Sequence, residues 1–237
     1  MKNKKAIFFD LANTLMYLEP SYAGAFANVA RDFGYDTSDD DVSKILAHVD
    51  NHIKEHTINK KIHTTSSKES ELFWLEINKM IFMLSGIKNT NNEIEKLAHE
   101  MERRFNSGEI SKAFDDSHSV LKKLKKHGYV IGIITNGTEG ISNTIEKLGF
   151  CEHIDFCIIS SVVGWEKPSR EIFDIALKKA GVLPEETIHI GDDLITDIAG
   201  ANNSGIEPIL LDRSGIHKET NHCKHVINNL NDIMHIL

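Results

Sequence analysis

Five short apolar segments, separated by helical patterns, constrain the fold of this 237-residue chain more than any other feature. They are mostly apolar from end to end, as strands buried on both faces of a sheet are. The segments are AIFF at 6–9, YVIGIIT at 129–135, FCIIS at 156–160, TIHI at 187–190 and EPILL at 207–211. Helical patterns at 117–128 and 169–181 lie between them. This alternation predicts an α/β fold with a Rossmann-like, doubly wound parallel sheet.

Residues 16–115 interrupt the alternation of strand and helix. They contain four segments with a helical apolar stripe, and we find no convincing strand among them. We therefore expect an all-helical insertion at 16–115 within a core formed by residues 1–15 and 116–237. Inside the insertion, the polar and Ser/Thr-rich segment 59–70 is typical of a mobile loop.

Charge and cysteine content narrow the classes of partner and compartment. The chain has 27 Lys and Arg against 35 Asp and Glu, and this net charge of -8 argues against a nucleic-acid partner held by a basic surface. Cys151, Cys157 and Cys223 are odd in number and form no CxxC pair, which indicates neither disulfides nor a thiolate zinc site. The apolar run before Asp10 is too short for a secretory signal, and no run is long enough to span a membrane. We expect a cytoplasmic protein without a membrane partner.

Polar residues stand at the point where four of the predicted strands end. Ligands of open parallel sheets bind beyond the carboxyl ends of the strands, so we expect these residues to lie close together. Carboxylates from two strands repel each other unless a hard cation lies between them, and Mg²⁺ is usually held by one or two carboxylates and a substrate phosphate. The residues are Asp10, then Thr135, Asn136 and Gly137, then Ser160 and Ser161, and then Gly191, Asp192 and Asp193.

Chemistry on a phosphate ester would use these residues together with a lysine. A carboxylate beside Mg²⁺ can attack phosphorus, so Asp10 is the candidate nucleophile. Thr135 could donate to a phosphoryl oxygen, and Lys167 could balance the negative charges. Each residue alone has a structural explanation, such as a strand-ending threonine or a loop lysine before Pro168. Their order and shared location favour the functional interpretation.

Four segments resemble the four motifs of the haloacid dehalogenase-like hydrolase superfamily. They span both ends of the chain and are specific to that superfamily. The resemblance implies a Rossmann-like core, with the helical insertion as a mobile cap domain over the active site, and most members are Mg²⁺-dependent phosphatases. The segments are AIFFDLANTL at 6–15, GIITNG at 132–137, GWEKPSREIF at 164–173 and IHIGDDLITDIAGA at 188–201.

The resemblance also implies a role for each matched residue. Asp10 would be the nucleophile and a metal ligand, Asp192 would complete the metal site, and the backbone carbonyl of Ala12 would be a further ligand. One of two auxiliary acids would lie near the metal, and the other would orient the lysine or the waters of the metal. The phosphoryl-binding residues would be Thr135, Asn136, Gly137 and Lys167. The auxiliary residues would be Thr14, Asp193 and Asp197.

The chain departs from the family pattern at Ala12. Phosphatases of the family have DxDGT or DxDNT, whereas this chain has Asp10, Leu11, Ala12, Asn13 and Thr14. In the family, the missing acid protonates the leaving oxygen and then activates the water that breaks the aspartyl-phosphate. Its loss should cost roughly 10²–10⁴ in rate, which is about 3–5 kcal/mol of barrier. We therefore expect a slow phosphatase that acts on a small phosphorylated metabolite.

Four explanations of Ala12 are compatible with the sequence. The chain could be a phosphatase for esters with good leaving groups, or one whose insertion supplies the acid. It could instead cleave a carbon–halogen or carbon–phosphorus bond, it could be a weakly catalytic phosphate- and metal-binding protein, or the alanine could be engineered. Dehalogenases need no Mg²⁺ and lack the paired acids of GDD, and a phosphonate hydrolase needs a Schiff-base lysine, for which Lys54 is conceivable. The candidate acids of the insertion are His52, Lys54, Glu55 and His56.

Three further groups of residues invite functional interpretations that we consider less favoured. Segment 217–226 is rich in His and contains Cys223, but its spacing fits no standard zinc site, so we expect a solvated surface. Aromatic and Met residues of the insertion lie at helical spacing and are more typical of a core. Trp165 is the one aromatic residue that we expect near the site. The residues at helical spacing are Phe73, Trp74, Met80 and Phe82.

Overall fold

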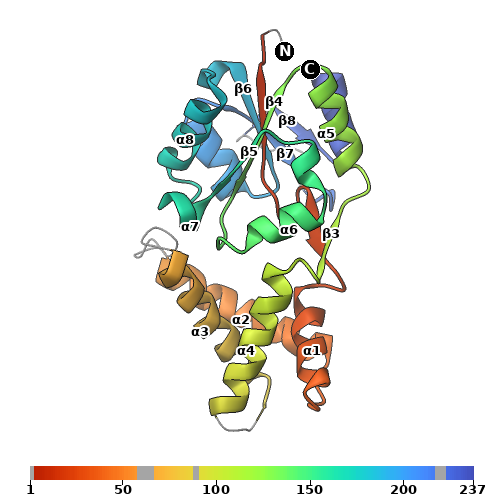
Figure 1. Ribbon diagram of the computed structural model, residues 1–237, viewed down its shortest axis with the longest axis vertical. Helices are drawn as coiled ribbons and strands as arrows, with labels where there is room; N and C mark the ends of the chain where they lie inside the picture. Colours follow the sequence, from red (N-terminus) through yellow and green to blue (C-terminus); the bar gives the residue numbers. More distant parts are fainter. Residues whose placement is uncertain (1–2, 58–66, 88–90, 217–222) are drawn as a thin grey trace.

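The centre of the computed structural model is a six-stranded sheet with the strand order β5-β4-β1-β6-β7-β8 (Figure 1). The structure describes residues 3–57, 67–87, 91–216 and 223–237, with the backbone alone for 50–57, 67 and 91. All neighbouring strands of this sheet pair in parallel, which confirms the predicted fold class. The strands are β1 Ala6–Phe9, β4 Val130–Thr135, β5 Phe156–Ile159, β6 Thr187–Gly191, β7 Glu207–Leu211 and β8 His225–Ile227.

Both faces of the sheet are covered by helices, because side chains along each strand alternate between the faces. On β1, Ile7 and Phe9 belong to a cluster with apolar residues of α5, α6 and α10. Ala6 and Phe8 point the other way and pack with residues of α8. This double burial explains why the strands read as continuous apolar runs. The helices of the core are α5 Ser117–Lys126, α6 Ile141–Lys147, α7 Ser160–Val163, α8 Arg170–Ala180, α9 Gly200–Asn203 and α10 Ile233–Ile236.

One glycine of the sheet is required by packing. A Cβ atom on Gly132 would lie 2.5 Å from the ring of Phe156 and 3.1 Å from the ring of Phe8. These two rings meet edge to face, with centroids 5.7 Å apart. The ring pair therefore occupies the space that a side chain on β4 would need, and a larger residue at 132 would displace it.

Strand β8 begins within segment 217–226, which we expected to be a solvated surface, and its described residues 223–226 are partly or fully exposed. His225 is the first residue of β8, which pairs with β7 at the edge of the sheet. Residues 217–222, including two of the histidines, lie outside the described residues. Cys223 donates a hydrogen bond from Sγ to the carbonyl of His225. The strand is three residues long in a polar context, too short to show a strand pattern in the sequence.

Four helices form the greater part of the insertion and lie below the sheet in the view of Figure 1. Their apolar residues form a cluster of their own, which includes Phe26, Phe82 and Leu97. The expected loop at 59–70 lies outside the described residues up to 66, and its last four residues are helical instead. Within the described residues, no helix is both long and apolar enough to cross a bilayer. The helices are α1 Tyr22–Asp32, α2 Asp39–Thr57, α3 Ser67–Leu84 and α4 Asn91–Asn106.

Two short strands, which we did not expect, connect the insertion to the core. Strand β2 (Met16–Leu18) leads into the helices and strand β3 (Ser111–Ala113) leads out, and the two pair antiparallel. Met16 packs in the cluster of the sheet, whereas Leu18 contacts both clusters. Packing therefore changes from core to insertion along this ribbon, and the division at 15/16 and 115/116 stays a prediction. Three-residue strands carry too few side chains to show periodicity.

Arg213, in the loop after β7, links the segment after β3 to the turn between β1 and β2. Its guanidinium binds both carboxylate oxygens of Asp116 at 2.8 and 3.0 Å and donates to the carbonyl of Thr14 at 2.8 Å. The same group lies 3.7 Å from the ring centroid of Phe114. A planar guanidinium can form a bidentate contact with a carboxylate and at the same time stack on an aromatic ring. Arg213 thereby holds together the segment that precedes β2 and the segment that follows β3.

Candidate active site

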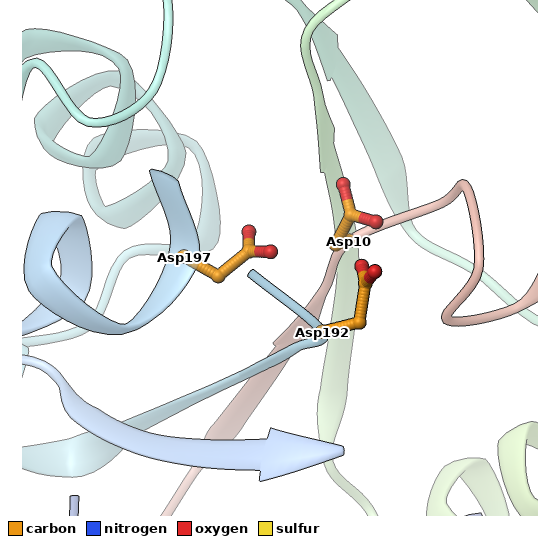
Figure 2. Close-up of side chains that lie close together, drawn as sticks. All are labelled: Asp10, Asp192 and Asp197. Carbon is orange, nitrogen blue, oxygen red and sulfur yellow. The ribbon is translucent and has the colours of Figure 1, made fainter. Parts of the chain in front are cut away.

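The predicted site residues gather at the carboxyl end of the central strands. Strand β1 lies between β4 and β6, so Asp10, Thr135 and Asp192 follow three adjacent strands. Figure 2 shows the carboxylates of Asp10 and Asp192 close together, with that of Asp197 nearby. Asp10 and Thr135 are buried, and the Thr135 hydroxyl has no hydrogen-bond partner within the described residues. The hydroxyl is thus available to a ligand.

Lys167 forms the electrostatic centre of this group. Its Nζ lies 2.5 Å from Oδ1 of Asp10 and 2.6 Å from Oδ1 of Asp197, and the side chain is buried. Burial alone would lower the pKa of Lys167, but the two carboxylates raise it above its usual value. The lysine is therefore an ammonium ion, positioned to balance charge on Asp10 and on an added phosphoryl group.

Asn136 fixes Lys167 through its backbone. Its side-chain amide donates to the carbonyl of Lys167 at 2.9 Å and accepts from the same residue's N–H at 2.8 Å. The N–H of Gly137 donates to Oγ of Ser160 at 3.0 Å. The predicted phosphoryl-binding groups of Asn136 and Gly137 are thus engaged with the protein, and their contact with substrate stays a prediction.

Asp197 is held by three hydrogen-bond donors and a close backbone approach, and one of the donors is the N–H of Asp193, 3.2 Å from Oδ2. Its Oδ1 accepts from Lys167 and from Nε2 of His189, the latter at 2.9 Å. Burial would raise the pKa of Asp197, but Lys167 and His189 hold it well below its usual range. A Cβ on Gly191 would overlap the Asp197 carboxyl group, so this approach requires glycine. Asp197 is therefore placed to orient Lys167.

The sequence interpretation missed His189. It is buried in the middle of β6, and its ring meets the ring of Phe173 at right angles with centroids 5.2 Å apart. Burial lowers its pKa despite the neighbouring Asp197 carboxylate. The available signal was a polar residue in the otherwise apolar run TIHI, since a buried polar side chain needs a partner.

Of the two auxiliary residues Asp193 and Thr14, only Thr14 forms a hydrogen bond with a predicted metal ligand within the described residues. Asp193 is exposed and accepts from the N–H groups of Ile195 and Thr196 at 2.8 and 2.7 Å. It caps the π-helical segment Leu194–Ala199, which is the structural role usual for an acid at a helix start. Thr14 is buried, and its hydroxyl donates to Oδ1 of Asp192 at 3.4 Å.

The acidic cluster has the composition of a divalent-cation site. Carboxylate oxygens of Asp10, Asp192 and Asp197 lie within 4.8 Å of one another. Burial raises the pKa of Asp10 to about 7, with Lys167 opposing and Asp197 adding to the shift. Burial and Asp197 raise the pKa of Asp192 to about 6. A bound cation would favour both ionised forms. Because Asp197 is already bound by Lys167 and His189, Asp10 and Asp192 are the acids that fit Mg²⁺.

Ala12 lies in the exposed turn after Asp10 and offers no acidic group. The next residue, Asn13, has a positive φ of 57°, and its N–H donates to the carbonyl of Met16 at 2.7 Å. An asparagine tolerates this left-handed conformation better than most residues. The turn thus reverses the chain beside Asp10 and returns it to β2.

The aromatic and methionine residues of the insertion divide between core and cavity. Phe82 is fully buried, and Phe73 and Met80 pack against the cluster of the insertion, as expected. Trp74 contacts that cluster and also lines a cavity facing the loop after β4. Trp165, expected near the site, packs against the α8 face of the sheet. The side chains of the candidate acids His52, Lys54, Glu55 and His56 lie outside the described part of the chain.

Sequence comparison assigns this chain to a known family. The family described as haloacid dehalogenase-like hydrolase matches residues 7–211. A glyceraldehyde 3-phosphate phosphatase from Methanothermobacter thermautotrophicus is 29% identical, over 92% of this chain and 90% of that protein. The chain belongs to the haloacid dehalogenase-like hydrolases, as the four motifs predicted.

Two solved structures share the fold over nearly the whole chain. The magnesium-bound crystal structure of YfnB from Bacillus subtilis has a TM-score of 0.77 and 18% identity, and covers 100% of this chain and 99% of that one. A 2-haloacid dehalogenase from Pseudomonas syringae has a TM-score of 0.68 and 22% identity, and covers 98% and 97%. At these identities the similarity establishes the fold alone.

Proposed function

We propose that this hydrolase is a Mg²⁺-dependent phosphatase that acts on a small phosphorylated metabolite through an aspartyl-phosphate on Asp10. The observation that carries the proposal is the buried contact of Lys167 with Asp10 at 2.5 Å, with the second acid Asp192 on the adjacent strand. A nucleophilic carboxylate, a fixed cation and a second acid are the parts that phosphoryl transfer to aspartate needs. The phosphatase relative supports the same chemistry.

In the first step, an oxygen of Asp10 forms a bond to phosphorus while the bond from phosphorus to the leaving oxygen breaks. Lys167 and the free hydroxyl of Thr135 stabilise the phosphoryl oxygens, and Asp197 keeps the ammonium group in place. Asp10 and Asp192 would hold Mg²⁺, which when bound neutralises charge between the nucleophile and the phosphate. Thr14 orients Asp192. Hydrolysis of the aspartyl-phosphate by water then releases inorganic phosphate.

The absence of an acid at Ala12 sets the expected rate. No side chain at that position can protonate the leaving oxygen or activate the hydrolytic water. We therefore propose a slow enzyme, or one whose substrate carries a good leaving group, because positioned acid–base catalysis is worth roughly 10²–10⁴ in rate.

Ala12 also favours one second candidate, cleavage of a carbon–halogen or carbon–phosphorus bond by a dehalogenase-type or phosphonatase-type reaction. A departing halide needs no proton, so a dehalogenase-type reaction would not require an acid at residue 12 to protonate the leaving group. The clustering of the Asp10, Asp192 and Asp197 carboxylate oxygens within 4.8 Å of one another supports the phosphatase, since a cation site has no use in a metal-independent dehalogenase. A weakly catalytic binding protein, or an engineered replacement at residue 12, would retain metal and phosphate binding without turnover.

The test is phosphate release from an activated aryl phosphate in Mg²⁺, with the Asp10→Asn variant as blank. A phosphatase gives turnover that EDTA abolishes and that the variant lacks. Halide release from a 2-haloacid that persists in EDTA would identify the dehalogenase instead. Mg²⁺ and phosphate binding with background turnover would identify the binding protein.

The proposed partner is a small molecule. The net charge of -8 supports an expectation of no nucleic-acid partner. The absence of a membrane partner and a cytoplasmic location stay predictions, based on the sequence features given above. Neither the substrate nor the oligomeric state is indicated by the sequence.

A further inference from the structure

A cavity of about 230 Å³ lies between the insertion and the loop after β4. Its core side is formed by Asn136 and Gly137, the residues that follow the phosphoryl-binding Thr135. Its opposite side comes from α1, α3 and α4. A phosphate ester bound at Asp10 would extend its leaving group toward this space, whose volume suits a group of a few atoms.

Three aromatic residues and one acid give the cavity its chemical character. Tyr22, Trp74 and Phe105 line it, together with Glu102. Among the described residues, the lining contains no lysine or arginine. Aromatic faces and an unneutralised carboxylate together favour a cation over an anion or a neutral group.

Glu102 has no partner for its buried oxygen. Oε1 is inaccessible to solvent and makes no hydrogen bond within the described residues. Burial, and then Glu71, raise the pKa of Glu102 above its usual value. An unpaired buried carboxyl is costly, so a ligand that supplies a donor and a positive charge would be stabilised there.

The basic residues beside Glu102 are bound elsewhere. Arg103 pairs with Glu100 at 2.7 Å and with Glu109 at 2.9 Å. Arg104 pairs with Glu100 at 2.8 Å and with Asp32 at 2.7 Å. Although both arginines directly follow Glu102 in α4, their guanidinium groups serve other acids. The carboxyl group of Glu102 thus lines the cavity without either of these arginines as a partner.

The end of α4 is fixed against the core, which keeps the cavity at a defined distance from the phosphoryl site. Thr138 donates from Oγ1 to Oδ1 of Asn106 at 3.1 Å. Thr144 donates from Oγ1 to the carbonyl of Phe105, also at 3.1 Å. Glu102 lies one turn before these residues on the same helix. The spacing between carboxyl group and phosphoryl site is therefore preorganised.

We propose that this cavity binds a cationic leaving group, so that the substrate is the phosphate monoester of a small amino alcohol whose ammonium group pairs with Glu102. This proposal rests on the phosphatase function proposed above. Lys167 would hold the anionic end of such a substrate, and the aromatic residues and Glu102 would hold its cationic end. The substrate is thereby selected by the separation of its two charges.

The first experiment compares turnover of 2-aminoethyl phosphate with that of propyl phosphate, an analogue of equal length in which a methyl group replaces the ammonium group. We expect kcat/KM to favour the amine by about tenfold or more, the usual value of a charge-assisted hydrogen bond. Glu102→Gln keeps the shape of the side chain and should lower this preference about tenfold, mainly through KM. Glu95→Gln, an exposed acid on the same helix, is the matched control and should leave the preference unchanged.

Titration calorimetry tests recognition without turnover. The ligands are 3-aminopropylphosphonate and butylphosphonate, in which a CH₂ group replaces the scissile oxygen. Tighter binding of the amine that Glu102→Gln abolishes, combined with no phosphate release from any ester, would contradict the phosphatase function and leave the cation site standing. Equal binding of both ligands by the wild-type chain, or a preference that survives in Glu102→Gln, would overturn the cation site. Urea unfolding of each variant confirms that it is folded.

Discussion

His189 of β6 donates a hydrogen bond from Nε2 to Oδ1 of Asp197 in the following π-helical segment, at a distance of 2.9 Å. Asp197 is ionised, because its pKa is held below the usual range, and an ionised carboxylate can only accept. Burial lowers the pKa of His189, so the ring is neutral and carries its proton on Nε2. Nδ1 has no partner within the described residues. His189 thus acts on the site only through Asp197 and Lys167, as a positioning residue.

Replacing His189 should therefore weaken both stability and catalysis. We expect His189→Leu to lower the free energy of unfolding by about 1–3 kcal/mol, because Asp197 loses a buried donor. We expect a decrease in kcat that is larger than any change in KM, since Lys167 would lose its fixed orientation. Urea unfolding and steady-state kinetics measure the two effects. His189→Gln, which retains an amide donor, should restore part of both, and a Gln variant no better than Leu would argue against positioning through this bond.

Proton and Mg²⁺ binding should compete at the acidic cluster. The pKa values of Asp10 and Asp192 are raised to about 7 and about 6. Since Mg²⁺ binds the ionised carboxylates, its affinity should increase about tenfold from pH 6 to pH 7. Calorimetric titration with MgCl₂ at both pH values measures this. An affinity independent of pH would show that these carboxyls are already ionised at pH 6.

The same pKa values predict how the stability of the metal-free chain depends on pH. Both groups bind protons more tightly in the folded chain than in the unfolded chain, so their protonation stabilises the fold. The free energy of unfolding should therefore decrease as the pH rises from about 4 to about 7. Asp197, whose pKa is lowered, loses its contribution only at lower pH. Urea unfolding in EDTA should show this slope, and it should be smaller in Asp10→Asn.

Restoring an acid at residue 12 should accelerate phosphate release. We expect Ala12→Asp to raise kcat for an aryl phosphate about a hundredfold or more, because it supplies the missing proton donor and base. Asn13→Asp adds the same charge one residue later and should give no such gain. An unchanged rate in Ala12→Asp, while Asp10 remains essential, would indicate an acid from the insertion or a different scissile bond.

Arg213 should not be replaceable by lysine. An ammonium group cannot contact both oxygens of Asp116, the carbonyl of Thr14 and the face of Phe114 at once. We expect Arg213→Lys to lower the free energy of unfolding by about 1–3 kcal/mol. Arg170→Lys is a suitable control, since Arg170 is exposed and its pair with Asp174 is solvent-screened. Equal effects of the two substitutions would contradict the role assigned to Arg213.

The sheet could be predicted from the sequence because burial on both faces makes its five longer strands continuously apolar. The short strands β2, β3 and β8 were missed, since three residues show no period. The convergence of Asp10, Thr135 and Asp192 followed from the rule that strand ends meet at one edge. The hydrogen bonds between the Asn136 side chain and the backbone of Lys167 could not be foreseen, because they depend on how two separate loops approach each other.

The contribution of the insertion to the site was the least predictable part. Glu102 lies in an ordinary amphipathic helix, and only the pairing of Arg103 and Arg104 with other acids shows that its carboxyl is unpaired. Whether a glutamate in such a helix is paired or unpaired depends on which basic groups lie near it in the folded chain. His189 was detectable in principle as a polar residue in an apolar strand, but its partner eight residues later could not be read from spacing alone.

The antiparallel pairing of β2 with β3 has a consequence for how such a protein can diversify. The chain leaves the core at Met16 and returns at Ala113, and these two residues face each other in the ribbon. Helices α1 to α4 can therefore be lengthened, shortened or exchanged without changing the register of any strand that carries Asp10, Thr135 or Asp192. Selection for a new substrate can act on the insertion while the candidate site residues of the core stay as they are.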